Sequence, residues 1–215
     1  MARTQRKNHL HFRVWFSRTI FESMLIVMSI LLALGVRAWQ DSREVRQLVS
    51  RSLNSFQNEI AQNRSRIDDL YRYHVGLQSL FADIDVHHSP ESTEDIRNIL
   101  NSFQSAVLLT SAWDTALATG ALSEMDYESV FVLSLTYGYQ QRFQTLYNSR
   151  LDDVLDLSTS DSISAGRVVE RASRYVAEIT AAEGDLLAAF DQAIELISEA
   201  LRDSGPARAV ALSSP

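Results

Sequence analysis

The chain has 215 residues, enough for one compact domain or for one domain with an appendage. Hydrophobic residues make up 46% of it and charged residues 22%, which excludes an intrinsically disordered chain. It contains no cysteine, so disulfide bonds, thiolate nucleophiles and zinc–thiolate sites are excluded as well. Only 7 glycines and 3 prolines interrupt the sequence, which predicts long, unbroken helices.

The charge is divided unevenly along the chain. Residues 1–39 carry a net charge of +5, whereas residues 40–215 carry −12. An acidic body of this kind repels phosphate backbones, so we expect no nucleic-acid partner. The basic residues that precede the first apolar segment are typical of the flank of a membrane segment.

An apolar segment follows the basic N-terminus. Residues 23–36 have no charged side chain, and their flanks extend the segment to 19–39, long enough to span a lipid bilayer. Glu22, Arg37 and Trp39 would then lie at the membrane interfaces. We expect an uncleaved signal anchor. The alternatives are a signal peptide cleaved near residues 36–38 and a buried helix of a soluble domain.

Four regions follow from this interpretation. They are a basic tail (1–18), a transmembrane segment (19–39), an acidic helical-bundle domain (40–203) and a disordered tail (204–215). Five Lys or Arg residues precede the apolar segment and four follow it within about 15 residues. This difference favours a cytoplasmic N-terminus and a periplasmic bundle in a bacterial inner membrane.

A heptad seam continues beyond the apolar segment. Apolar residues recur at alternating spacings of four and three from Val49 to Ile84, which predicts one helix running from about Arg18 to Ile84. Asn63 and His74 are the two polar residues in this seam. They could specify the register or the partner of the helix, and His74 could sense pH. Alternatively, both residues lie at the edge of the seam or are satisfied by neighbouring helices. The spacing leaves open whether the seam packs within one chain or between two.

Further helices are predicted downstream. Their expected ranges are 89–105, 111–120, from Ser123 to about 158, and from about 165 to 203, with Ser111 and Ser123 as caps. No alternating strand pattern is present, so the fold class is all-α. We expect a transmembrane helix continuous with a long helix that packs in an antiparallel bundle.

Motifs of known catalytic and phosphate-binding sites are absent from the sequence, and we therefore expect no enzyme and no cofactor. The one local group of potential metal ligands is Asp83, Asp85, His87 and His88, for which an exposed helix corner is the alternative. Trp113 and Gly120 bracket a short helix. Trp113 could line a ligand groove between helices or anchor this helix on the core.

Two stretches of the sequence resemble a group of uncharacterised bacterial single-pass membrane proteins, catalogued as domains of unknown function. In residues 22–41 a span opens with Glu22 and closes on Trp39, and in residues 112–137 a Trp–Gly segment precedes a helix rich in Leu and Tyr. The resemblance implies an inner-membrane location and a helical exported or juxtamembrane domain. It implies no activity.

The expected function is that of a membrane-anchored helical interaction or scaffold protein. Its expected partners are the lipid bilayer and either a second copy of the chain or another envelope protein, which would bind by helical packing. The alternatives are a sensory or small-molecule-binding bundle and, more distantly, a metal-dependent enzyme.

Overall fold

The computed structural model describes residues 8–83, 107–159 and 165–203. In these ranges the chain is all-α, and no strand is present. The helices are α1 (Asn8–Asp83), α3 (Ser111–Ala118), the short 3-10 helix η1 (Ala121–Glu124), α4 (Tyr127–Thr159) and α5 (Ala165–Asp203). The predicted helix at 89–105 lies outside the described residues.

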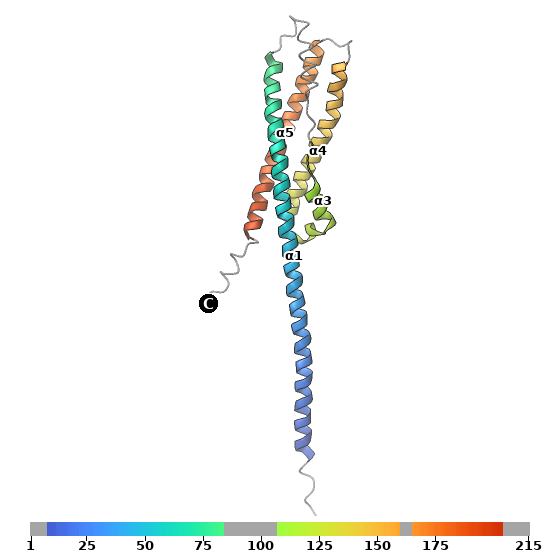
Figure 1. Cartoon of the computed structure of the whole chain (residues 1–215), viewed down its shortest axis with the longest axis vertical. Helices are drawn as coiled ribbons and strands as arrows, with labels where there is room; N and C mark the ends of the chain where they lie inside the picture. Colours follow the sequence, from blue (N-terminus) through green and yellow to red (C-terminus); the bar gives the residue numbers. More distant parts are fainter. Residues whose placement is uncertain (1–7, 84–106, 160–164, 204–215) are drawn as a thin grey trace, which may run out of the picture. The chain divides into compact units, whose positions relative to one another are not determined.

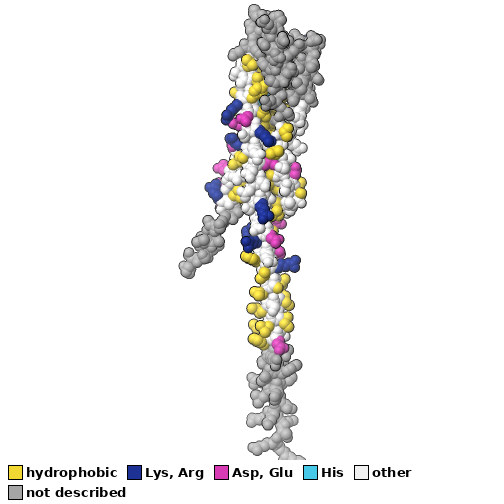
Figure 2. All heavy atoms as spheres, viewed as in Figure 1, with side chains coloured by type: hydrophobic (Ala, Val, Ile, Leu, Met, Phe, Trp, Pro, Cys, Tyr) yellow, Lys and Arg dark blue, Asp and Glu magenta, His cyan; other side chains and the backbone are white. Residues whose placement is uncertain are grey.

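The chain divides into two compact units, Met1–Gln47 and Leu48–Pro215. In the first unit, the described apolar side chains of α1 from Phe21 to Trp39 are exposed. Figure 2 shows apolar side chains on both sides of this stretch of the helix. This stretch makes α1 long and apolar enough to cross a membrane, with a mean hydropathy of 1.8 over a window of which none is buried.

The second unit is a bundle in which α1, α4 and α5 lie side by side (Figure 1). Gln57, Arg64 and His74 of α1 contact Ser198, Asp191 and Glu183 of α5, in that order. The residue numbers of the α5 partners fall as those of α1 rise, so α5 runs antiparallel to α1. Glu59 and Asn63 of α1 contact Tyr137 and Gln140 of α4, respectively. These residue numbers rise together, so α4 runs parallel to α1.

The heptad seam forms the buried face of α1 within the second unit. Its central positions are fully or almost fully buried: Leu53, Phe56, Ile60, Asn63, Ile67, His74, Leu77 and Phe81. They pack within the chain against buried residues of α4 and α5, which include Leu133, Phe143, Ile179 and Phe190. Burial of this apolar surface is the main force that holds the three long helices together.

The predicted caps of the shorter helices are wrong. Ser111 does not cap α3, because its hydroxyl instead donates to Glu59, and Thr110 occupies the N-cap position. Asp126, rather than Ser123, caps α4, because its carboxylate accepts from the backbone N–H of Ser129. Residues 121–124 form η1, so the predicted start of the helix at Ser123 is three or four residues too early.

Candidate functional site

A polar clamp at the centre of the bundle holds the segment that leads into α3. Asn63 binds both backbone groups of Leu109: its Oδ1 accepts from the N–H at 2.9 Å and its Nδ2 donates to the C=O at 2.8 Å. Gln140 of α4 donates to the same C=O at 2.8 Å and accepts from Asn63 at 3.1 Å. Both side chains are buried, and these bonds satisfy a stretch of backbone that lies outside any helix.

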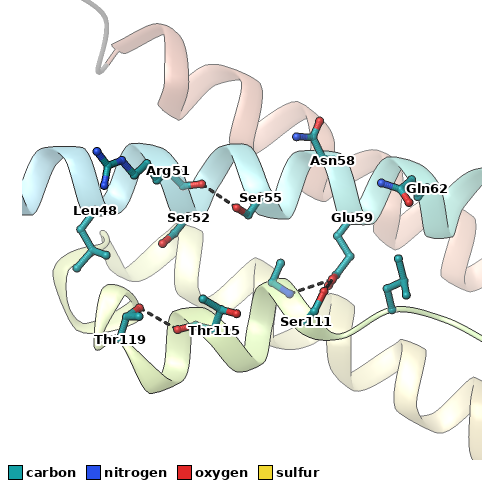
Figure 3. A pocket seen from close by; sticks show the side chains of 12 residues that line it. Leu48, Arg51, Ser52, Ser55, Asn58, Glu59, Gln62, Ser111, Thr115 and Thr119 are labelled. Atoms are coloured by element: carbon teal, nitrogen blue, oxygen red, sulfur yellow. Dashed lines mark hydrogen bonds between the residues drawn. The ribbon is translucent and has the colours of Figure 1, made fainter.

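Glu59 lies one helical turn before Asn63 and completes the clamp. Its carboxylate accepts from the Ser111 hydroxyl at 2.5 Å, the Ala112 N–H at 2.9 Å and the Tyr137 hydroxyl at 2.7 Å. Figure 3 shows Glu59 pointing from α1 across to Ser111 at the start of α3. Burial and the adjacent Glu59 carboxylate raise the pKa of Tyr137, so its proton stays on the hydroxyl and is donated to Glu59.

The clamp joins one face of α1 to the segment that leads into α3. Glu59, Asn63 and Arg66 follow one another at intervals of four and three residues and therefore share a face of α1. Arg66 donates to the C=O of Val107 at 2.9 Å, so Arg66, Asn63 and Glu59 contact residues 107, 109 and 111–112, respectively. The polar residue Asn63, predicted to lie in the seam, thus contacts a segment of its own chain.

Two grooves flank α3. The α1–α3 groove, of about 490 Å³, is lined by Ser52, Ser55 and Glu59 among others (Figure 3). The α3–α4 groove, of about 590 Å³, lies on the other side of Trp113 and includes Asp114, Gly138, Gln141 and Asn148. Both volumes fall in the range of small-molecule sites, and both linings are rich in hydroxyl and amide groups.

A second buried polar contact joins α1 to α5. His74 Nδ1 lies 2.8 and 3.0 Å from the two carboxylate oxygens of Glu183, and neither side chain is exposed. Burial raises the pKa of Glu183, and the hydrogen bond from His74 opposes this shift. Burial likewise raises the pKa of Tyr147 of α4 to about 12, and the nearby Glu183 carboxylate adds to the effect.

The candidate metal ligands lie at the end of the described part of α1. Asp83 is the last residue of the helix, and Asp85, His87 and His88 lie outside the described residues. Within the described ranges no three His, Asp or Glu side chains are grouped so that they could hold a metal ion. The metal site therefore stays a prediction.

Trp113 lies in the first turn of α3, and Gly120 follows the end of this helix. The Trp113 ring lies 5.2 Å from that of Tyr137 and 6.4 Å from that of Phe56, and its side chain is half-buried. It packs against the core and also lines the α3–α4 groove. Gly120 has φ of 73°, a left-handed conformation that a residue with a Cβ rarely adopts, and it separates α3 from η1.

The residues predicted to lie at membrane interfaces are all exposed on α1 in the first unit. Glu22 lies near the start of the exposed apolar stretch, and Arg37 and Trp39 lie at its end. The Arg43 guanidinium sits over the Trp39 ring at 5.7 Å from its centre. Tryptophan is enriched at membrane–water interfaces, where its ring lies at the level of the headgroups.

Sequence reasoning missed three residues of the buried polar network. Glu59 and Glu183 are acidic residues on amphipathic helices, a type that usually faces solvent, and Gln140 gives no local signal. Their partners lie 78, 109 and 77 residues away in the sequence, so only the tertiary structure brings them together. The sequence matches no protein-family model, no curated protein and no solved structure.

Proposed function

We propose that this chain is a membrane-anchored helical interaction protein of the bacterial inner membrane. It spans the bilayer once and carries its bundle on the periplasmic side. Support for this location comes from the exposed apolar helix, from the excess of basic residues on its N-terminal side, and from the resemblance of residues 22–41 to single-pass membrane proteins.

The exposed apolar stretch of α1 is the observation that carries the proposal. Its apolar side chains from Phe21 to Trp39 are exposed, and none of the most apolar window is buried. Monomeric soluble proteins rarely expose apolar patches of more than a few hundred Å². Lipid covers such a surface without any further partner, because the backbone of a helix is already hydrogen-bonded.

A second exposed apolar surface, on the bundle itself, supports the interaction role. Tyr127, Phe131, Leu135 and Tyr139 recur every four residues and form one stripe on the outer face of α4, which we call the α4 stripe. Tyr127 is 83% exposed, and its ring stacks on Phe131 at 6.1 Å. The bundle core forms without these side chains, so their apolar surface is available to a protein partner.

Membrane topology is the first test. Alkaline phosphatase fused after Ser204 should be active in a full-length fusion that stays in the membrane fraction after carbonate washing. An inactive fusion that remains in the membrane would place the bundle in the cytoplasm. Active fusion released as a shorter soluble form would show that the apolar segment is a cleaved signal, and the anchor would be refuted.

Photo-cross-linking tests the interaction role. A benzoylphenylalanine introduced at Phe131, in the α4 stripe, should give a protein adduct in intact cells. The same probe at Asp185, an exposed residue of α5, serves as the control and should give none. An adduct of twice the chain mass identifies a second copy as the partner, and another mass identifies a different protein. Monomer alone at both positions would contradict the proposal.

A further inference from the structure

The α3–α4 groove has the lining of a site for a neutral, hydroxyl-rich ligand. None of the residues that line it is basic, so it offers no charge partner to a phosphate or carboxylate. Most of its side chains are amides or hydroxyls, so it would not favour an apolar ligand either. Amides both donate and accept hydrogen bonds, which suits the hydroxyl groups of a sugar.

The amide groups form an ordered row along α4. Gln141, Gln144 and Asn148 follow at intervals of three and four residues and therefore lie on one face of the helix. Ser134 and Gly138 continue the same face toward the start of α4, and the row from 134 to 148 extends over roughly 21 Å at 1.5 Å per residue. A row of this length suits a chain of several sugar rings better than a single one.

Trp113 provides an aromatic surface beside this row. Contacts with Tyr137 and Phe56 fix the indole in place, while its half-buried side chain still lines the groove. Asp114, the next residue, accepts from the Thr110 hydroxyl at 3.0 Å and adds one oriented acceptor. An indole face with nearby hydrogen-bonding groups combines an apolar surface with polar groups that fix orientation, as ligand sites do.

Gly138 leaves open space in the lining of the groove. A Cβ built at this residue would meet no atom within 4 Å, so neither packing nor a turn requires glycine there. Glycine in the interior of a helix costs about 1 kcal/mol relative to alanine. The missing side chain lets a ligand approach the backbone of α4 at this point of the row.

We propose that the α3–α4 groove binds a neutral oligosaccharide. The sugar rings would lie along α4, with one ring against Trp113 and their hydroxyl groups hydrogen-bonded to Gln141 and Asn148. This binding function is additional to the membrane anchoring and does not depend on it.

Calorimetric titration of the full chain with chitotetraose and cellotetraose tests the proposal. Lipid nanodiscs are used, because maltoside detergents carry sugar headgroups of their own. At least one of the two sugars should bind, and tetragalacturonate, an anionic chain of similar length, should not. Replacing both Gln141 and Asn148 by alanine should weaken binding about tenfold or more, because two exposed hydrogen-bonding groups are lost. Gly138→Leu should abolish binding, because its side chain fills the open space beside residue 138.

The matched control lies on the other side of α3. Asn58→Ala with Gln62→Ala removes the same two kinds of side chain from the α1–α3 groove and should leave the affinity unchanged. Circular dichroism verifies that each variant keeps its helical content. No binding of either neutral sugar up to about 10 mM, or equal loss of affinity in the control variant, would overturn the proposal. Equal binding of tetragalacturonate would also overturn it.

Discussion

The His74–Glu183 pair shows how much a single buried side chain depends on its partner. Both groups are fully buried, and the pair links α1 to α5 in the middle of the bundle. Removing one partner from a buried pair leaves an uncompensated polar group and costs about 3–5 kcal/mol, whereas replacing both by apolar residues is often close to neutral. The stability of the bundle thus depends on the match between these residues.

A double-mutant cycle tests this dependence. His74→Leu and Glu183→Leu should each lower the free energy of unfolding by about 3–5 kcal/mol. The double variant should lose clearly less than the sum of the two. Urea unfolding of the full chain in detergent, followed by circular dichroism, measures all four proteins. Additive losses would show that the two side chains stabilise the bundle independently.

Tyr147 leads to a prediction about alkaline stability. Its pKa is raised to about 12 by burial, compared with about 10 in an unfolded chain. Between pH 10 and pH 12 the unfolded state therefore releases this proton while the folded state keeps it, and stability falls as the pH rises. Burial also raises the pKa of Tyr137 and of Tyr175, which adds to the fall.

Tyr147→Phe should reduce this loss of stability between pH 10 and pH 12. Among the described residues the Tyr147 hydroxyl has no hydrogen-bond partner, so its removal should also raise the free energy of unfolding at pH 7 by about 1 kcal/mol. Urea titrations at pH 7, 10 and 11.5 measure both effects. An unchanged pH dependence would show that Tyr147 ionises equally in both states.

At the scale of the elements, the sequence predicted the helices well and their polar contacts poorly. The seam from Val49 to Ile84 predicted the buried face of α1, because burial repeats with the helical period. The caps at Ser111 and Ser123 were predicted wrongly, because Glu59 and Gly120 compete for those hydroxyl groups. The clamp was not predicted, since each of its bonds joins residues more than 30 positions apart.

Asn63 tests whether the clamp fastens the segment before α3 to the bundle. Asn63→Asp keeps the size of the side chain and the acceptor for the Leu109 N–H, but it directs a second acceptor at the Leu109 C=O and at Gln140. We expect a loss of about 2–3 kcal/mol and faster hydrogen exchange at Leu109. Asn54→Asp, on an exposed position of α1, is the control and should change neither quantity.

Two glycines should respond to alanine with opposite signs. Gly120→Ala forces a Cβ into the left-handed region between α3 and η1 and should destabilise the bundle by about 1–2 kcal/mol. Gly76→Ala, in the interior of α1 with no atom within 4 Å of the new Cβ, should stabilise it by about 0.5–1 kcal/mol. Thermal unfolding of both variants measures the signs, and equal signs would contradict the argument.

At the scale of the whole molecule, the two compact units have different physical requirements. The first unit presents apolar side chains outward, whereas the second has a buried apolar core between α1, α4 and α5 and exposes the α4 stripe. A substitution in the exposed apolar stretch should therefore change the fraction of protein in the membrane without changing the free energy of unfolding of the bundle. The same α1 helix provides residues to both units.

Leu31→Arg tests this separation. A positive charge near the centre of a membrane segment costs about 2.5–3.5 kcal/mol on insertion scales, so a larger part of the protein should be extracted by carbonate. The urea midpoint of the bundle, followed at near-ultraviolet wavelengths in detergent, should stay unchanged. Leu53→Arg, in the buried seam, should lower the urea midpoint of the bundle and leave the carbonate extraction unchanged. Unchanged fractionation of Leu31→Arg would count against the membrane anchor.

The clamp has a consequence for which sequence changes the chain can tolerate. Its bonds to Val107 and Leu109 are made to backbone atoms, so they do not depend on which side chains those residues carry. Many residue types are therefore compatible with positions 107 and 109, but proline is not compatible with 109 or 112, where the N–H group is a donor. Saturation mutagenesis of positions 107 and 109 would show broad tolerance, with proline excluded at 109, while positions 59, 63 and 140 would accept almost nothing.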